Sequence, residues 1–366
     1  MKIRLPEYGN CIANLACSIL RYYGLDAPNA TLKQADELLR REFQNVVLIL
    51  LDGMGTSTVK EHLSPDGFFR NHLRCSYSST FPPTTVAATT AVMSGLYPNQ
   101  SAWLGWTGYF DEIDRNVVYF MNKDNDTGEK IQDINVAATY VPFPAIQDSI
   151  AQTGVRTHWL TSWMSPACKT YSGMMEEILR LCEQDARSFI YAYWEEPDNT
   201  MHKKGVSSEE TKALVQQLED LTAQLSNQLQ NTLLLVTADH GLIDSKTLLF
   251  CEDHALMQCL VRPPSIESRA MNLFVKEEQK QYFEKLFRSR YGENYQLLPM
   301  EEVMARNLFG TGSNHDRLPR MLGNYLAIAT GEVTLRMKDK KFVGEHAGLT
   351  FDEMTIPLIA FSLNQI

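Results

Sequence analysis

Acidic residues and histidines recur together along the sequence, mostly directly after apolar runs. Each such side chain is a candidate metal ligand, and the set is Asp52, Asp198, His202, Asp239, His240 and His346. Carboxylate oxygen and imidazole nitrogen together suit zinc or manganese. Six ligands exceed what one tetrahedral ion needs, which points to two ions, and a two-ion site fits phosphoryl chemistry. Taken singly, each motif has a structural alternative, because an aspartate before a glycine can simply form a turn.

A candidate nucleophile lies in residues 79–98, STFPPTTVAATTAVMSGLYP. Thr84 or Thr85 can cap a helix there, small residues allow the helix to pack closely, and Gly95 closes it. A hydroxyl is thereby placed at a helix N-terminus, where free N–H groups and the positive end of the dipole favour an anion. A threonine oxygen activated by a metal ion could attack such an anion. The alternative is an ordinary capped and tightly packed helix.

Strand-like runs precede three of the candidate aspartates. Residues 46–55, 189–198 and 233–241 each begin with an apolar run typical of a strand that is covered on both faces. Helical patterns at 174–185 and 209–229 alternate with these runs. Such alternation predicts an α/β fold with a mostly parallel central sheet flanked by helices on both faces. In that fold the carboxyl ends of the strands form the ligand-binding edge, where we expect the candidate ligands to meet.

The chain divides unevenly by pattern. Residues 247–340 mix short strands, a polar helix and a Gly/Asn/Arg-rich stretch, and we interpret them as an inserted, cap-like α+β subdomain. Residues 1–246 and 341–366 would then form the metal-binding catalytic domain, with the last apolar run returning to the main sheet. Two amphipathic helices are predicted at 14–23 and 32–43, and both are expected to pack on the outside.

Composition excludes several classes of protein. The 366 residues contain 34 Lys and Arg against 44 Asp and Glu, and the net charge of −10 gives no basis for binding a nucleic-acid scaffold. The seven cysteines are scattered without a C-x-x-C pair, which favours a reducing compartment. Neither a signal-peptide apolar region nor an uninterrupted apolar run of about eighteen residues is found. We therefore expect a cytoplasmic protein without a membrane partner.

In this order, the motifs resemble the alkaline phosphatase superfamily, and most closely its type I phosphodiesterase and nucleotide pyrophosphatase branch. The resemblance spans most of the chain. It rests on the strand-end Asp52, the threonine before SGLYP, D-x-x-x-H at 198–202, D-H-G at 239–241, and HAGLTFDEM from 346. The joint occurrence of these motifs is far more specific than any one of them.

The resemblance assigns a role to each candidate. The family's nucleophile lies ten residues before the glycine of SGLYP, which selects Thr85 rather than Thr80. His315 competes with His346 as the last ligand, but the closing motif favours His346. The resemblance implies two divalent ions, usually zinc with manganese as the alternative. One would be held by Asp52, Thr85, Asp239 and His240, and the other by Asp198, His202 and His346.

The chain departs from the branch at one position. The family places an asparagine that contacts the phosphoryl group shortly after this motif, where this chain has Trp106. Trp106 belongs to an aromatic cluster that either packs internally or provides a stacking wall for a leaving group. The members of the cluster are Trp103, Trp106, Tyr109 and Phe110.

The resemblance predicts a two-metal hydrolase of phosphoric esters: a phosphodiesterase or nucleotide pyrophosphatase that acts on a small-molecule ester through a phosphothreonine. The alternatives are a phosphomonoesterase or phosphonate hydrolase of the same superfamily, or a non-catalytic binding protein that retains the fold. The C/S-x-P-x-R signature of the sulfatases is absent, which argues against a sulfatase. Residues 76–114 contain no Lys or Arg that could neutralise a monoester dianion, so we expect diesters to be the better substrates. The sequence leaves the oligomeric state unknown.

Overall fold

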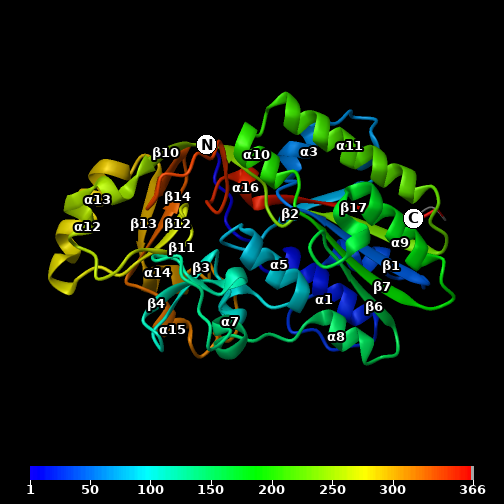
Figure 1. The fold of residues 1–366 in the computed structure, drawn as a ribbon, viewed down its shortest axis with the longest axis horizontal. Helices are drawn as coiled ribbons and strands as arrows, with labels where there is room; N and C mark the ends of the chain where they lie inside the picture. The colour runs from blue at the N-terminus through cyan, green and yellow to red at the C-terminus, as the bar shows by residue number, and fades with distance from the viewer. Residues whose placement is uncertain (364–366) are drawn as a thin grey trace.

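The computed structural model describes residues 1–363, in which two β-sheets lie next to each other, each with its own helices (Figure 1). The central sheet has the strand order β2-β17-β8-β1-β7-β6. Its strands are β1 (Asn45–Leu51), β2 (Leu73–Ser78), β6 (Arg156–Leu160), β7 (Ser188–Trp194), β8 (Thr232–Thr237) and β17 (Thr355–Phe361). The three strands predicted before the candidate aspartates are therefore present, as β1, β7 and β8.

The sheet is mixed: β6, β7, β1 and β8 pair in parallel, whereas β17 and β2 at the other side are joined by antiparallel pairing. β1 lies between β7 and β8 and pairs with both in parallel, and β6 pairs with β7 in parallel. Every residue of β1 is buried, as its unbroken apolar run predicts. β17 is antiparallel to β8 and to β2, because the C-terminal apolar run returns to the sheet in the opposite direction.

Helices cover both faces of the central sheet, which confirms the predicted α/β fold (Figure 1). One face carries α1 (Ile12–Tyr22), α5 (Thr85–Ser94) and α8 (Ile146–Ala151), and the other carries α3 (Thr56–His62), α9 (Tyr171–Cys182) and α11 (Glu209–Ser226). Shorter helices complete this part of the chain: α2 (Lys33–Leu38), α4 (Phe68–Asn71), α6 (Pro98–Ser101), α10 (Asp198–Lys204) and α16 (Phe351–Met354).

The N-terminal helices differ from the prediction. α1 is buried along most of its length and contacts α5, so it is part of the core rather than an outer helix. Its apolar residues belong to the same buried cluster as those of β1 and β7, and the helix packs directly against α5. α2 ends at Leu38, earlier than the predicted helix.

The second sheet has the strand order β13-β14-β12-β11-β3-β4-β5. Its strands are β3 (Thr107–Phe110), β4 (Arg115–Val118), β5 (Lys123–Asp124), β11 (Ser265–Ile266), β12 (Ala270–Leu273), β13 (Tyr295–Pro299) and β14 (Tyr325–Ala329). The helices beside it are α7 (Val136–Tyr140), α12 (His254–Met257), α13 (Lys280–Tyr291), α14 (Met300–Ala305) and α15 (Leu318–Met321). Two small ladders join β10 (Lys246–Leu249) to β15 (Val333–Arg336) and β9 (Ile243–Asp244) to β16 (Gly344–Glu345).

This sheet is wider than the predicted insertion. Its strands β11 to β14 fall within 247–340, but β3 to β5 come from 107–124, and β11 pairs directly with β3. The segment after α5 therefore leaves the central sheet, adds three strands to the second sheet and returns. The predicted division into two domains, residues 1–246 with 341–366 and residues 247–340, stays a prediction. The second sheet contains strands from both of these parts of the chain.

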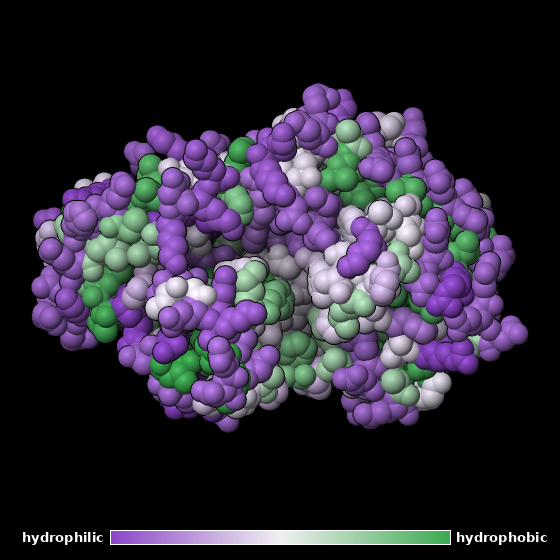
Figure 2. All heavy atoms as spheres, viewed as in Figure 1, coloured by the Kyte–Doolittle hydropathy of each residue, from purple (hydrophilic) through white to green (hydrophobic). Residues whose placement is uncertain are grey.

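Hydrophilic side chains cover most of the face shown in Figure 2, and hydrophobic ones form smaller patches between them. Within residues 1–363, no helix combines the length and the apolar character needed to cross a membrane. Exposed hydrophobic side chains include Trp163 and Met164, which follow β6 at the carboxyl edge of the central sheet.

A buried ion pair links the two sheets. Arg269 precedes β12 in the second sheet, and Glu353 lies in α16 directly before β17. Their side chains form a bidentate pair, with Nε to Oε1 at 2.7 Å and Nη2 to Oε2 at 2.9 Å. Both side chains are fully buried. Glu353 also accepts from the Gly348 N–H at 2.7 Å and from the Thr350 hydroxyl at 2.6 Å, so the pair also orders the loop that carries His346.

We expect Arg269→Met to destabilise the protein strongly. It leaves the Glu353 carboxylate buried without its counter-charge, a change that typically costs about 3–5 kcal/mol. Thermal unfolding followed by calorimetry should show a much lower Tm. The matched control is Arg306→Ala, which removes the exposed pair with Glu302 and should change the Tm little. Equal effects of the two substitutions would contradict the linking role.

Candidate active site

The three candidate aspartates lie together because they follow three neighbouring parallel strands. Asp52 follows β1, Asp239 follows β8 and Asp198 follows β7, and these strands are adjacent in the order β8-β1-β7. The pairing of Leu50 with Thr237 places Asp52 level with Asp239. The Asp198 N–H donates to the Asp52 carbonyl oxygen at 3.0 Å, which closes the edge on the β7 side. All three side chains are buried.

Three histidines surround the carboxylates, and the backbone orients each ring. His202 lies one turn after Asp198 in α10, His240 follows Asp239, and His346 follows β16. The Nδ1 atoms lie 2.7 Å from Gly344 O, 3.2 Å from Gly241 O and 3.1 Å from Pro83 O, respectively. Because a carbonyl oxygen only accepts, we assign the ring proton to Nδ1 in each case. The Nε2 atoms of His202 and His346 are then left for a ligand, the usual arrangement for metal-binding histidine. Burial alone would lower the pKa of His240, but the charges of Asp239 and Asp52 and a hydrogen bond with Asp52 raise it to about 10, so a metal ion at its Nε2 would have to displace a proton.

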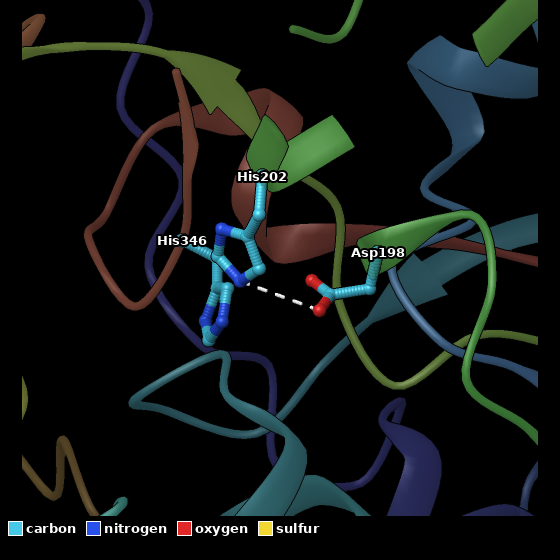
Figure 3. A group of neighbouring side chains, drawn as sticks. All are labelled: Asp198, His202 and His346. Atoms are coloured by element: carbon cyan, nitrogen blue, oxygen red, sulfur yellow. Dashed lines mark ion pairs between the residues drawn. The ribbon is translucent and has the colours of Figure 1, made fainter. Parts of the chain in front are cut away.

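The side chains form two overlapping groups. Asp198, His202 and His346 each offer a ligand atom within 4.8 Å of the others, and so do Asp52, Asp198 and His240. Figure 3 shows the first group: the Asp198 carboxylate faces His202, and His346 points into the same space from a different loop. His202 Nε2 lies 3.3 Å from Asp198 Oδ2. The His240 and His346 rings stack with centroids 3.9 Å apart, which brings the two groups into contact.

Asp239 lies just outside these groups. Its Oδ1 accepts from the N–H groups of Gly53 at 3.0 Å and His240 at 2.9 Å, and its Oδ2 lies 3.6 Å from His240 Nε2. Asp239 therefore holds the turn after β1 with one oxygen and presents the other to the site.

The buried charges perturb one another strongly. Burial, and then the charge of Asp52, raise the pKa of Asp198 and of Asp239 above the usual range of a carboxyl group. Burial would also raise the pKa of Asp52, but its hydrogen bond with His240 and the charge of that ring hold it low. Burial lowers the pKa of His202 to about 4, and burial with the charge of His240 lowers that of His346. Burial disfavours the charged form of each group, and like charges nearby add to that effect unless a counter-ion is present.

The residues fit a bound divalent cation. Asp198 Oδ1 and Asp239 Oδ2 are both buried and have no hydrogen-bond partner among residues 1–363. Buried carboxylate oxygens normally have partners, and a metal ion is one of the few that would satisfy these. The donor set of carboxylate oxygen and neutral imidazole nitrogen suits zinc or manganese.

The Thr85 hydroxyl is directed at these ligands from the start of α5. Its Oγ1 lies 3.2 Å from His240 Nε2 and 3.4 Å from Asp52 Oδ2. The two other candidate threonines are placed differently. The Thr84 hydroxyl donates to Glu267 Oε1 at 2.6 Å, and the Thr80 hydroxyl is buried without a hydrogen-bond partner among the described residues.

The aromatic cluster proposed from the sequence splits into two parts. Trp103, Tyr109 and Phe110 are buried, and Trp103 stacks on Tyr119 with centroids 4.8 Å apart, so these three rings pack internally. The Trp106 side chain is 38% exposed, so it remains available to stack against a leaving group. His315 lies in a loop before α15, where its Nδ1 accepts from the Arg317 N–H at 3.2 Å, and it belongs to neither ligand group.

Four side chains near the site were missed by the sequence analysis. The Tyr193 hydroxyl donates to Asp52 Oδ2, and Phe342 stacks on His202 with centroids 4.1 Å apart. Lys340 lies over the Phe342 ring, with Nζ 3.8 Å from its centroid. Glu267 comes from the second sheet. Tyr193 could have been found as a polar-tipped residue near the end of a buried strand, whereas nothing local marks the others.

The comparisons with known proteins agree with one another. A family model described as Type I phosphodiesterase / nucleotide pyrophosphatase matches residues 46–340. Murine ectonucleotide pyrophosphatase / phosphodiesterase 5 is similar in structure, with a TM-score of 0.65 and 14% identity over 87% of this chain and 88% of that chain. The human protein of the same name gives the same values. An inactive form of the murine protein in complex with AMP has a TM-score of 0.63 and 13% identity, covering 88% of both chains. No curated protein matches the chain.

We expect chelation to lower the thermal stability of this protein, because the buried carboxylates then lack a counter-charge. Zinc or manganese should restore the Tm, since an ion at about 100 times its Kd adds about 2.7 kcal/mol. Metal analysis should find close to two ions per chain in the wild type and close to one in His202→Ala, which leaves the group around Asp52 and His240 intact. His315→Ala is the control and should retain the full metal content. A His202→Ala protein with unchanged metal content would contradict the grouping.

Proposed function

This chain belongs to the type I phosphodiesterase / nucleotide pyrophosphatase family and is a hydrolase of phosphoric esters, and we propose that it cleaves small-molecule phosphodiesters or pyrophosphates with Thr85 as nucleophile. The observation that carries the proposal is the position of the Thr85 hydroxyl. It begins a helix and lies within 3.5 Å of both Asp52 and His240, two members of a cation-binding group. A threonine that only capped or packed a helix would not require a carboxylate and an imidazole beside its hydroxyl.

In this proposal the site holds two divalent ions, with zinc preferred and manganese as the alternative. One would be held by Asp52, Thr85, Asp239 and His240, and the other by Asp198, His202 and His346. The second set is supported by the group of three ligand atoms, and the first by the orphaned Asp239 oxygen. When bound, such ions lower the pKa of a hydroxyl and neutralise charge on the phosphoryl oxygens.

The chain's own groups would direct the reaction. The Thr85 oxygen attacks phosphorus as its proton passes to solvent water, and the ester oxygen departs on the opposite side with the bonding electron pair, which gives a phosphothreonine. The amides at the start of α5 and the positive end of its dipole face the non-bridging oxygens. A water oxygen then bonds to phosphorus, the bond between the Thr85 oxygen and phosphorus breaks, and the Thr85 oxygen regains a proton as the attacking water loses one. Two in-line steps predict retention of configuration at phosphorus.

A structural neighbour and an exposed aromatic ring both support nucleotide-like substrates. An inactive form of a structural neighbour is in complex with AMP, which supports nucleotides as candidate substrates here. The exposed Trp106 ring offers a surface on which a base or another planar group could stack.

The cytoplasmic location stays a prediction from the sequence.

One observation favours a second candidate, a phosphomonoesterase. Lys340 lies over Phe342, which stacks on the ligand His202, and its charge interacts with that of Asp198. A monoester dianion needs such a cation beyond the ions themselves. We favour the diesterase because a ring separates Lys340 from His202 and because residues 76–114 contain no basic side chain.

Thr85→Ala should abolish nearly all turnover while leaving the fold and most of the metal in place, because it removes the attacking oxygen alone. Thr85→Ser should keep part of the activity, since it keeps a hydroxyl at the same helix start. Release of nitrophenol from bis(4-nitrophenyl) phosphate measures both variants. Thr80→Ala is the control. Loss of activity in Thr80→Ala with retention in Thr85→Ala would mean that the wrong hydroxyl has been chosen.

We expect phosphodiesters to be turned over better than phosphomonoesters. The measurement is kcat/KM for bis(4-nitrophenyl) phosphate and for 4-nitrophenyl phosphate at the same metal content and pH. A preference of about tenfold or more for the monoester would overturn this expectation. In that case Lys340→Ala should remove the preference, whereas Lys341→Ala, at the exposed neighbouring position, should not.

A further inference from the structure

The residue at the N-cap position of α5 does not use its side chain to cap the helix. Thr84 occupies the N-cap position in an extended conformation, where a threonine oxygen usually accepts from an amide of the first turn. Thr84 makes no such bond. Its hydroxyl instead donates to Glu267 Oε1 at 2.6 Å. The first backbone bond of the helix runs from Ala88 N–H to Thr84 O, so the amides of residues 85–87 have no partner within the helix.

Glu267 is held firmly in place by the second sheet. It lies in the tight turn between β11 and β12, where its N–H donates to Ala270 O at 3.1 Å. The same Oε1 that binds Thr84 accepts from the Trp106 N–H at 2.8 Å. Two residues further on, Arg269 makes the buried pair with Glu353. The position of the Glu267 carboxylate is therefore fixed from three directions.

These contacts suggest why a cap residue is turned away from its helix. Thr85 presents its hydroxyl to the ligands from this same first turn, so a phosphoryl group attacked by Thr85 lies against the free amides. A Thr84 oxygen bonded to one of those amides would occupy the place of a non-bridging phosphoryl oxygen. The bond to Glu267 prevents this.

We propose that Glu267 is a positioning residue that holds the Thr84 hydroxyl away from the first turn of α5 and so keeps the helix N-terminus open to the phosphoryl group. This inference rests on the proposed function, since it assumes that Thr85 is the nucleophile. The simple alternative is that Glu267 acts through its negative charge. This alternative predicts the opposite effect of removing Glu267 on the binding of an anion. A carboxylate near an anion repels it, so removal of that carboxylate would strengthen binding.

A double-mutant cycle separates these roles. Glu267→Ala frees the Thr84 hydroxyl to cap the helix, and Thr84→Val has no oxygen with which to cap. A capping bond is worth about a factor of five to ten, so Glu267→Ala should lower kcat/KM for bis(4-nitrophenyl) phosphate by ~tenfold in the wild-type background. In the Thr84→Val background the same substitution should cost less than ~threefold. Glu267→Gln keeps an acceptor oxygen and should recover most of what Glu267→Ala loses.

A second readout does not depend on turnover. Titration of the metal-loaded proteins with inorganic phosphate, followed by calorimetry, should show the same pattern in Kd: weaker binding for Glu267→Ala and little further change when Thr84 is valine. Equal losses in both backgrounds would overturn the proposal in favour of a structural role, and tighter binding would overturn it in favour of charge repulsion. If wild type and Thr85→Ala are equally active, the proposed nucleophile fails, whereas the phosphate titration still tests the coupling of Glu267 and Thr84.

Discussion

Three carboxylates buried at the ends of adjacent strands impose the main constraint on this structure. The register of β8, β1 and β7 brings Asp239, Asp52 and Asp198 to one edge, where water cannot screen their charges. Such a cluster is unfavourable without positive charge nearby. The surrounding side chains supply only part of this positive charge, because burial lowers the pKa of His202 and His346 and keeps both rings neutral. The site is therefore built for cations, as the orphaned oxygens of Asp198 and Asp239 indicate.

The backbone gives the site its precision. Carbonyl oxygens of Gly344, Gly241 and Pro83 orient the three imidazole rings. Gly344 and Pro83 lie far in sequence from the histidines they contact, whereas Gly241 directly follows His240. Second contacts of this kind orient ligands and set their tautomers. The Tyr193 hydroxyl does the same for Asp52 from the neighbouring strand. Asp52, His202 and His346 are thus each held by a segment other than their own, so the geometry of the site depends on how loops dock around the strand edge.

The second sheet takes part in this arrangement rather than standing apart. Its Arg269 is locked to Glu353 beside the loop of His346, and its Glu267 holds the residue before Thr85. Both residues lie in one short turn between β11 and β12. This one turn of the second sheet therefore contacts residues next to both His346, the last proposed metal ligand, and Thr85, the proposed nucleophile. The same turn follows β11, which pairs with β3 through Ile266 and Thr107, 159 residues apart in the sequence.

The sequence by itself determined the α/β fold, the strands β1, β7 and β8, and the residues at their ends, because an unbroken apolar run followed by a polar residue is a local signal. The choice of Thr85 as the candidate nucleophile came instead from the resemblance to the family, whose spacing to the glycine of SGLYP it matches. Tertiary structure alone decided that α1 is buried, that 107–124 joins the second sheet, and that Glu267, Phe342 and Lys340 lie near the ligands. These features depend on contacts between distant segments, and no local pattern of hydrophobicity or charge encodes which loop will meet which strand end.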